Sequence, residues 1–207
     1  MINISGNFDT TEKELAVVNR IFQENGIAVK SIEKYKNADD GDVLVTLMND
    51  KEILIEVKEE SYKRFSNYGD LGIDFLSAFY FLRNESRWKG APKSHELLND
   101  FFKDIDRERY FKEGKMFYSK ADLWLFFVMD NDRFVYYAFF DGKKMISNEF
   151  REYLTQNCKF AINNKTINQL SNSDPYNSAV FFINHENPLI KQFEIDLNEY
   201  IQKDTKC

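Results

Sequence analysis

Two short apolar runs separated by a turn signal lie in the first third of the chain. Residues 43–48 and 52–57 are rich in β-branched and aliphatic side chains, a composition that favours β-strands. Asn49, Asp50 and Lys51 lie between the two runs, and residues of these types favour a tight turn. The pattern therefore predicts a hairpin of two antiparallel strands.

Charged residues stand at the open end of this predicted hairpin. Asp42 comes directly before the first strand, and Glu56 and Lys58 lie at the end of the second. A turn of two or three residues puts Asp42 opposite one of residues 57–59, within about one strand residue, roughly 3.3 Å, of the acid and the base. Because side chains alternate along a strand, Glu56 and Lys58 share a face. The sequence therefore predicts two carboxylates and one ammonium at one sheet edge.

Such a set of side chains suits a hard divalent cation. Mg²⁺ prefers oxygen ligands and keeps several waters, so Asp42, Glu56 and the Val57 carbonyl would leave positions for a phosphate and an attacking water. Lys58 is expected to orient or help deprotonate that water and to offset charge growing on the phosphate. The residues therefore predict metal-dependent phosphodiester cleavage, with Asp42, Glu56 and Lys58 as catalytic residues and Mg²⁺, or Mn²⁺ in its place, as cofactor.

The tripeptide at residues 56–58 carries little information by itself. An acid followed two residues later by lysine also occurs at residues 113–115, 141–143 and 204–206. Only the first example ends an apolar strand whose predicted partner strand begins with an aspartate. The alternative interpretation is an ordinary solvated hairpin end, in which Asp42 is a turn residue.

Asp42, the thirteen residues that follow it and Glu56-Val57-Lys58 resemble the pattern of the PD-(D/E)xK nuclease superfamily, which includes restriction endonucleases, Holliday-junction resolvases and phage nucleases. The resemblance spans about residues 10–141. It implies an α/β (α+β) fold with a mixed central β-sheet flanked by helices, in which a helix, a three-stranded meander, a second helix and a further strand follow in order. It also implies a Mg²⁺-dependent nuclease of phage type, with DNA rather than RNA as the expected partner. Gly41 stands where the superfamily usually has proline.

A helical pattern precedes the hairpin. Thr11 and Glu14 form a capping-box pair, apolar residues recur at helical spacing over 15–22, and Gly26 follows, so a helix of about four turns is expected. The resemblance implies that Glu14 faces the metal. The residues by themselves favour the capping role, which satisfies backbone donors without a metal.

The resemblance extends to the segment after the hairpin. It implies that residues 59–70 form a loop leading into a strand at 71–76, in which Asp74 would be a further metal ligand. Lys63, Arg64 and Tyr68 on that loop are candidate phosphate contacts. A charged loop that is simply solvated is the alternative.

A second hairpin is predicted further along the chain, with strands over 123–128 and 134–140 on either side of Asn131 and Asp132. The segment before it resembles the Ser/Thr-Lys-Ala-Asp-aromatic segment of related phage nucleases, which implies that Lys120 lies near the site and binds phosphate. An ordinary strand-edge lysine is the alternative. The consecutive apolar residues favour a strand buried on both faces over a base-stacking surface.

Composition narrows the function further. The net charge of −6 argues against a protein that coats nucleic acid without sequence preference. Any contact with a polyanion would therefore need a local basic region, for which the stretch 83–93 is a candidate. An ordinary surface connection is the alternative for that stretch. Two histidines are too few for histidine-clustered phosphoesterases, and no phosphate-binding glycine-rich loop is present. Two cysteines without metal-ligand spacing are expected to be free thiols.

One nuclease-like domain over residues 1–207 is predicted, with its core at about 10–141 and residues 142–207 as an extension packed on it. A helix at 148–154, a strand at 178–183 and an apolar segment at 188–201 are expected there, and they would extend the sheet, form a dimer surface or supply specificity. No apolar run reaches the roughly 18 residues of a membrane span, so a cytoplasmic protein is expected. A catalytically inactive nuclease-fold protein acting as a binding module, and a binding protein of unrelated α/β fold, are the alternative functions.

Overall fold

The structure, a computed structural model, describes residues 10–38, 40–80, 111–164 and 176–203. The chain divides into two compact units. The first comprises residues 1–71, 119–147 and 184–207, and the second comprises residues 72–118 and 148–183. Both combine helices with β-sheet, so the predicted mixed α/β fold class is confirmed. One domain with an extension over residues 142–207 stays a prediction.

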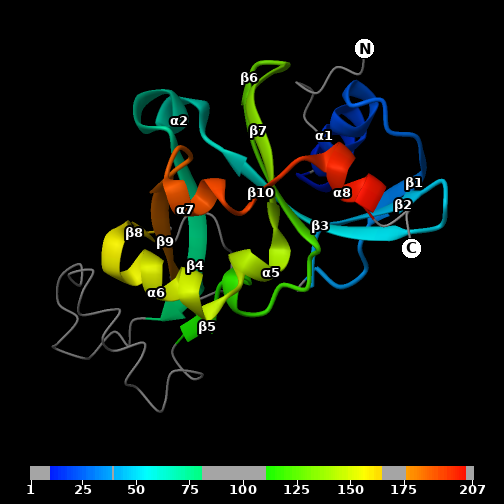
Figure 1. Cartoon of the computed structure of the whole chain (residues 1–207). Coiled ribbons are helices and arrows are strands. Elements are labelled where there is room, and N and C mark those ends of the chain that lie inside the picture. Colours follow the sequence, from blue (N-terminus) through cyan, green and yellow to red (C-terminus); the bar gives the residue numbers. More distant parts are fainter. Residues whose placement is uncertain (1–9, 39, 81–110, 165–175, 204–207) are drawn as a thin grey trace, which may run out of the picture. The chain divides into compact units, whose positions relative to one another are not determined.

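The first unit is built on a mixed sheet with the strand order β1-β2-β3-β6-β7-β10 (Figure 1). In this sheet β3 and β6 are parallel, and the other neighbouring strands are antiparallel. Its elements are α1 (Thr10–Glu24), β1 (Val29–Lys34), β2 (Val43–Leu47), β3 (Glu52–Glu60), α2 (Tyr62–Tyr68), β6 (Leu123–Asp130), β7 (Arg133–Asp141), α5 (Gly142–Met145), α7 (Pro188–Lys191), β10 (Glu194–Ile195) and α8 (Leu197–Lys203).

The first predicted hairpin is confirmed as β2 and β3, but its turn differs by one residue from the prediction. The Asp50 amide donates to the Leu47 carbonyl at 3.0 Å, and the Leu47 amide donates to the Lys51 carbonyl at 2.8 Å. Asp50 has a positive φ of 64°, as in the common three-residue hairpin loop that ends in a left-handed residue. The chain therefore reverses around residues 48–50 instead of 49–51.

One face of this sheet carries the apolar core of the first unit. Alternating residues of β2, β3 and β6 pack there against α1 and α8, and Figure 1 shows both helices beside these strands. This side of the sheet is a conventional core in which each strand contributes every second residue. Its buried members are Val17, Val18, Ile21, Phe22, Val43, Val45, Leu47, Ile53, Ile55, Val57, Leu123, Leu125, Phe127, Phe139 and Leu197.

The second face of the sheet is lined by the intervening residues. In β6 these include Trp124 and Phe126, whose rings stack with centroids 6.2 Å apart. Phe126 in turn meets Phe140 of β7 edge to face at 5.6 Å. Every residue from Leu123 to Val128 is buried, so the prediction that this strand is buried on both faces is confirmed.

Sequence reasoning missed a helix directly after β3. Residues 62–68 form α2 within the stretch that the resemblance implied to be a loop. Gly69 ends the helix in the left-handed conformation, with φ 64°, and its amide donates to the Phe65 carbonyl at 2.7 Å. Glycine adopts this conformation without steric cost, which explains where the helix stops. The expectation of a loop was therefore wrong for most of this segment.

The C-terminal segment is less regular than its apolar pattern predicts. Residues 188–201 form two short helices, α7 and the start of α8, with β10 between them. In β10, Glu194 and Ile195 pair with Phe140 and Phe139 of β7. This segment therefore extends the sheet by a short edge strand, one of the three roles considered for it.

The second unit contains a sheet with the order β5-β4-β9-β8. Phe75 lies at its centre, with ring centroids 5.2 Å from Phe117 and 5.0 Å from Phe181. Arg151 donates to the Met116 carbonyl at 3.1 Å and fixes the unit's helix to the short turn before it. The elements are β4 (Asp70–Tyr80), which starts at the boundary between the units, β5 (Phe111–Glu113), the 3₁₀ turn η2 (Lys115–Phe117), α6 (Asn148–Asn157), β8 (Lys159–Asn164) and β9 (Tyr176–Asn184).

Several other predicted elements are confirmed. The helix after Thr11 is α1, the second hairpin is β6 and β7, the helix at 148–154 is part of α6, and the strand at 178–183 is part of β9. None of the helices in the described ranges is long and apolar enough to cross a membrane.

Candidate functional site

The register of the first hairpin fixes where Asp42 lies along β3. Val43 pairs with Ile55, the last pair of this ladder, and the Asp42 amide also donates to the Ile55 carbonyl. Asp42 was expected opposite one of residues 57–59, and this expectation is corrected, because Asp42 lies beside Ile55, the residue before Glu56. The physical reason is the turn, because a reversal around residues 48–50 shifts the pairing by two residues.

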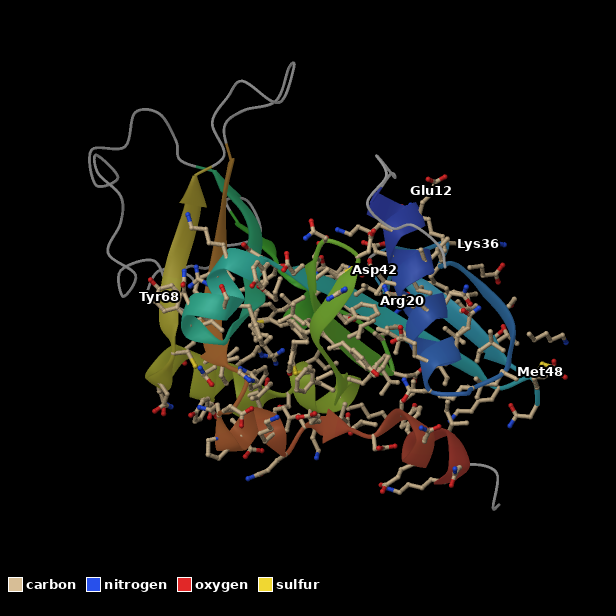
Figure 2. The ribbon with its side chains drawn as sticks, turned by 90° about the horizontal axis from the view of Figure 1, so that it is seen from above. Glu12, Arg20, Lys36, Asp42, Met48 and Tyr68 are labelled. Carbon is tan, nitrogen blue, oxygen red and sulfur yellow. The ribbon has the colours of Figure 1, made fainter. Side chains whose placement is uncertain are left out.

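Asp42 is held in place by β3 and β1. Its amide donates to the Ile55 carbonyl at 3.0 Å, and its carbonyl accepts from the Tyr35 amide at 2.9 Å. Its carboxylate oxygen Oδ2 accepts from the Val57 amide at 2.8 Å. Figure 2 labels Asp42 in this region of the first unit. The backbone of Asp42 is therefore hydrogen-bonded on both sides, and its half-buried side chain is held by the Val57 amide.

Gly41, directly before Asp42, lies against the Leu54 side chain. A Cβ atom at Gly41 would lie 2.7 Å from Cγ of Leu54, and another atom of that side chain would lie 2.9 Å away. Contacts this short do not occur between carbon atoms, so a larger residue would displace Leu54. Glycine at this position leaves room for the Leu54 side chain against the backbone just before Asp42.

Glu56 and Lys58 form an ion pair on the second face of the sheet. Lys58 Nζ lies 2.8 Å from Glu56 Oε1. The Glu56 side chain is fully buried, whereas 19 % of the Lys58 side chain is exposed. A buried carboxylate is tolerated when it is paired, and the partly exposed Lys58 side chain supplies that pairing. Trp124 lies on the neighbouring strand with its ring centroid 6.0 Å from Lys58 Nζ.

The Val57 carbonyl lies on the Asp42 side of β3. Leu54 directs its backbone groups toward β6, since the Asp122 amide donates to the Leu54 carbonyl at 2.8 Å. Backbone groups of successive strand residues point alternately to the two neighbouring strands, so Val57 directs its N–H and C=O toward Asp42. The hydrogen bond from the Val57 amide to Asp42 agrees with this direction.

Glu14 belongs to the same group of side chains. Burial and the nearby carboxylates of Asp42 and Glu56 raise the pKa of Glu14 to about 7, although Lys58 and Lys34 act in the opposite direction. A capping role alone does not account for this shift, because a cap lowers the pKa of a carboxylate by hydrogen bonding to its charged form. Glu14 therefore lies within electrostatic reach of both predicted acids.

Two further contacts that the sequence did not reveal join the first turn of α1 to the end of β3 and to the end of β1. Lys13 Nζ lies 2.5 Å from Glu59 Oε1, and Lys34 Nζ donates to the Thr11 hydroxyl at 3.0 Å. The helix starts at Thr10, one residue before the predicted cap. Such contacts join residues far apart in sequence, so neither periodicity nor spacing could have indicated them. We call Glu14, Asp42, Glu56 and Lys58 the acid cluster.

Lys120 is tied to the segment that leads into Asp42. Its amide donates to the Asp40 carbonyl at 2.8 Å, and its ammonium lies 3.0 Å from Asp40 Oδ1. The Ser119 hydroxyl donates to the same carbonyl at 3.1 Å. The Lys120 side chain is 71 % exposed, so its charge is open to an external anion. It also lines a groove of about 360 Å³ together with Ser119, Ala121, Asp122, Asp141, Lys143, Ile146 and Tyr200.

The other predicted phosphate contacts lie on α2. Lys63 is exposed, and Arg64 is half-buried with one nitrogen 3.7 Å from Asp70 Oδ2. Both follow β3 directly and belong to the first unit. The candidate basic stretch at 83–93 lies outside the described residues.

Asp74 is described in the second unit. It lies in β4 and is half-buried. The acid cluster is made of residues of the first unit, so Asp74 is not counted among them.

The acid cluster has the donor chemistry of a hard-cation site, but Glu56 and Asp42 already have protein partners. Among the described residues, no three His, Cys, Asp or Glu side chains are arranged to hold a metal ion. Glu56 is engaged by Lys58, and Asp42 is engaged by the Val57 amide. Three carboxylates, two of which raise the pKa of the third, Glu14, fit a cation by charge and by ligand type. Coordination would require Glu56 to exchange the Lys58 ammonium for the cation.

No family model matches the chain, and no curated protein or solved structure matches it.

Proposed function

We propose that this protein is a Mg²⁺-dependent nuclease that hydrolyses phosphodiester bonds, with DNA as the expected substrate. The observation that carries the proposal is the Glu56–Lys58 ion pair on β3 together with Asp42, which accepts a hydrogen bond from the Val57 amide between them. Asp42 and Glu56 also raise the pKa of Glu14 on α1. Three carboxylates beside one lysine are the groups that metal-dependent phosphodiester cleavage requires. Mn²⁺ is expected to substitute for Mg²⁺.

The order of the elements supports the same proposal. The helix α1 is followed by the antiparallel strands β1, β2 and β3 and by the helix α2. After α2 the chain passes through β4 and β5 of the second unit, and β6 then lies parallel to β3. This order agrees with the helix, three-stranded meander, helix and strand that the resemblance to PD-(D/E)xK nucleases implies. The resemblance adds a restriction-endonuclease-like core to the proposal.

Each residue of the acid cluster has a role under this proposal. Asp42, Glu56 and the Val57 carbonyl would hold the cation, with Glu14 as a further ligand. When bound, Mg²⁺ would neutralise phosphate charge and lower the pKa of a coordinated water. Lys58 is partly exposed, so its ammonium can leave Glu56 and donate to a phosphate oxygen. Lys120 would contact a neighbouring phosphate through its exposed ammonium.

A second candidate function is that of an inactive nuclease-fold protein that binds protein or nucleic acid. The observation that favours it is the complete burial of Glu56 in an ion pair with Lys58. A pair of this kind can serve the fold alone. Binding of Mg²⁺ to the acid cluster separates the two candidates, because only the nuclease requires it.

The test is a cleavage assay on a panel of substrates. Purified protein is incubated with single-stranded, duplex and branched DNA and with RNA, with Mg²⁺, with Mn²⁺ or with a chelator. Glu56→Gln, Lys58→Ala and Glu14→Gln are compared with the wild type. Glu12→Gln, an exposed carboxylate on the same helix, and Lys30→Ala, an exposed lysine on β1, are the matched controls.

We expect cleavage that needs the cation, is lost in the three acid-cluster variants and is unchanged in the two controls. Wild-type protein that cleaves nothing with either cation would favour the binding module. Cleavage that survives in Glu56→Gln and Lys58→Ala would refute the residue assignments. The proposal includes a cytoplasmic location and nucleic acid as the partner, without a membrane.

A further inference from the structure

The helix α2, which follows the strand that carries Glu56 and Lys58, exposes two aromatic rings. Tyr62 is 43 % exposed and Tyr68 is 64 % exposed, and Figure 2 labels Tyr68 on this helix. The other large apolar side chains exposed in the described ranges are Met48 and Val135. Both exposed aromatic residues of this kind therefore lie on one helix of seven residues.

The inner side of α2 is anchored, which leaves these rings on a fixed support. Phe65 packs with ring centroids 4.8 Å from Tyr136 and 4.9 Å from His185. Asn184 donates to the Tyr68 carbonyl at 2.7 Å, and the His185 amide donates to the Gly69 carbonyl at 2.8 Å. A helix held in this way presents its outer side chains with little freedom to lose on binding, and this favours binding.

Positive charge accompanies the two rings. Lys63 follows Tyr62 directly and is exposed, and Arg64 lies next to it. Aromatic rings interleaved with cations are the combination that binds unpaired nucleic acid, because bases stack on the rings while the cations contact the backbone. Bases in a duplex are already stacked on one another and do not offer their faces.

The helix lies within a few nucleotides of the acid cluster. Tyr62 comes four residues after Lys58, with only Ser61 between β3 and α2. Four residues span at most about 14 Å, which corresponds to about four nucleotides at 3.4 Å each. A strand seated on α2 could therefore reach the cluster without leaving the first unit.

We propose that α2 is a binding surface for unpaired nucleic acid, on which Tyr62 and Tyr68 stack bases and Lys63 contacts phosphate. The substrate class is then single-stranded or locally unpaired DNA. The part of this inference that concerns cleavage rests on the proposed nuclease function. The binding surface itself does not.

The test measures binding without cleavage. Fluorescence anisotropy follows a labelled single strand and its matched duplex in the presence of a chelator. The variants are Tyr62→Ala, Tyr68→Ala and Lys63→Ala, with Tyr62→Phe and Tyr68→Phe as conservative replacements. Met48→Ala and Val135→Ala are the matched controls, because these side chains are exposed to 65 % and 48 % and lie away from α2 in sequence.

Each tyrosine-to-alanine change is expected to weaken single-strand binding about fivefold or more, since one stacked base is worth at least about 1 kcal/mol. The phenylalanine variants should bind within about twofold of the wild type, because they keep the stacking face. Lys63→Ala should reduce the salt dependence of binding by about one charge. The two controls should bind single strand as the wild type does, and no variant should selectively weaken duplex binding.

Wild-type affinity in the tyrosine-to-alanine variants, or an equal loss on single strand and duplex, would overturn the proposal. Tyrosine-dependent self-association in size-exclusion chromatography, with no effect on nucleic acid, would also overturn it and indicate a protein interface. Failure of the nuclease proposal is distinguishable. In that case Glu56→Gln and the wild type both bind single strand through the tyrosines and neither cleaves it.

Discussion

The two faces of β3 differ in what they bury. Ile53, Ile55 and Val57 point into an apolar core shared with α1, whereas Glu56 and Lys58, on the alternate positions, form a charged pair beside Trp124. The first face is an ordinary apolar core, whose burial stabilises the fold. The second face carries a buried carboxylate at a desolvation cost that a hydrophobic residue would avoid. The proposed function accounts for this cost by assigning Glu56 and Lys58 to the site, and substitutions on each face should separate the two.

The largest expected effect on stability belongs to the apolar face. Ile55 is fully buried, so Ile55→Ala should lower the free energy of unfolding by about 2 to 5 kcal/mol through lost burial and a residual cavity. Urea denaturation measures this loss. The cleavage rate of the fraction that remains folded should stay at the wild-type value, and a specific loss of rate would contradict the division between the faces.

The charged face should respond to the loss of one partner. Lys58→Met removes the ammonium from a fully buried carboxylate, and we expect a destabilisation of about 2 to 3 kcal/mol, somewhat below the range for deeply buried pairs because Lys58 reaches solvent. Glu56→Gln in the same protein should restore part of the loss. A double-mutant cycle measures the coupling, and additive effects would mean that the pair contributes nothing.

Glu14 should make stability depend on pH. Its pKa in the folded protein is about 7, above the ordinary value of 4.5, so between these values the folded state binds more protons than the unfolded state. Stability should therefore fall as the pH rises through 7. Because the group is half-exposed and screened by solvent, the loss should be about 1 kcal/mol.

The measurement for Glu14 is thermal unfolding at pH 5 and pH 8 without divalent cations. Glu14→Gln should gain stability relative to the wild type at the higher pH and not at the lower one. Glu12→Gln, an exposed position on the same helix, should lack this pattern. An equal effect of Glu14→Gln at both pH values would show that Glu14 does not share the charge environment of Asp42 and Glu56.

The smallest expected effect on stability is that of Lys120→Ala. Its ammonium is 71 % exposed beside Asp40, and pairs of this kind contribute at most about 1 kcal/mol. DNA affinity should nevertheless fall, with a salt dependence lower by about one charge. Lys143→Ala in the same groove shows whether the effect is particular to Lys120. Unchanged affinity and salt dependence would remove Lys120 from the substrate path.

The sequence predicts those parts of the structure that depend on local patterns of side chains. The hairpin, α1 and the second hairpin follow from local patterns of apolar residues, and these predictions are confirmed. The register of Asp42 was wrong because it depends on the left-handed conformation of Asp50, which moves the turn by one residue. The alternation of side chains along a strand predicted that Glu56 and Lys58 share a face, and the observed ion pair between them requires this.

The remaining features depend on contacts between distant parts of the chain. The parallel pairing of β3 with β6 puts Trp124 beside Glu56, and no pattern within either segment indicates it. The position of Glu14 depends on Lys13 and Lys34, which bind groups on other elements. The short helix α2 was missed because its seven residues, Tyr62–Tyr68, are mostly polar and include none that is fully buried.

The most direct test of the central claim is the single-turnover cleavage rate of Glu56→Gln relative to the wild type on single-stranded DNA in Mg²⁺. The substitution keeps the shape of the side chain and removes the charge that would hold the cation. We predict that the rate falls by at least about 100-fold, as it does when one group that stabilises a transition state is removed. The variant should unfold as cooperatively as the wild type. A rate equal to that of the wild type would contradict the assignment of the acid cluster as a nuclease site.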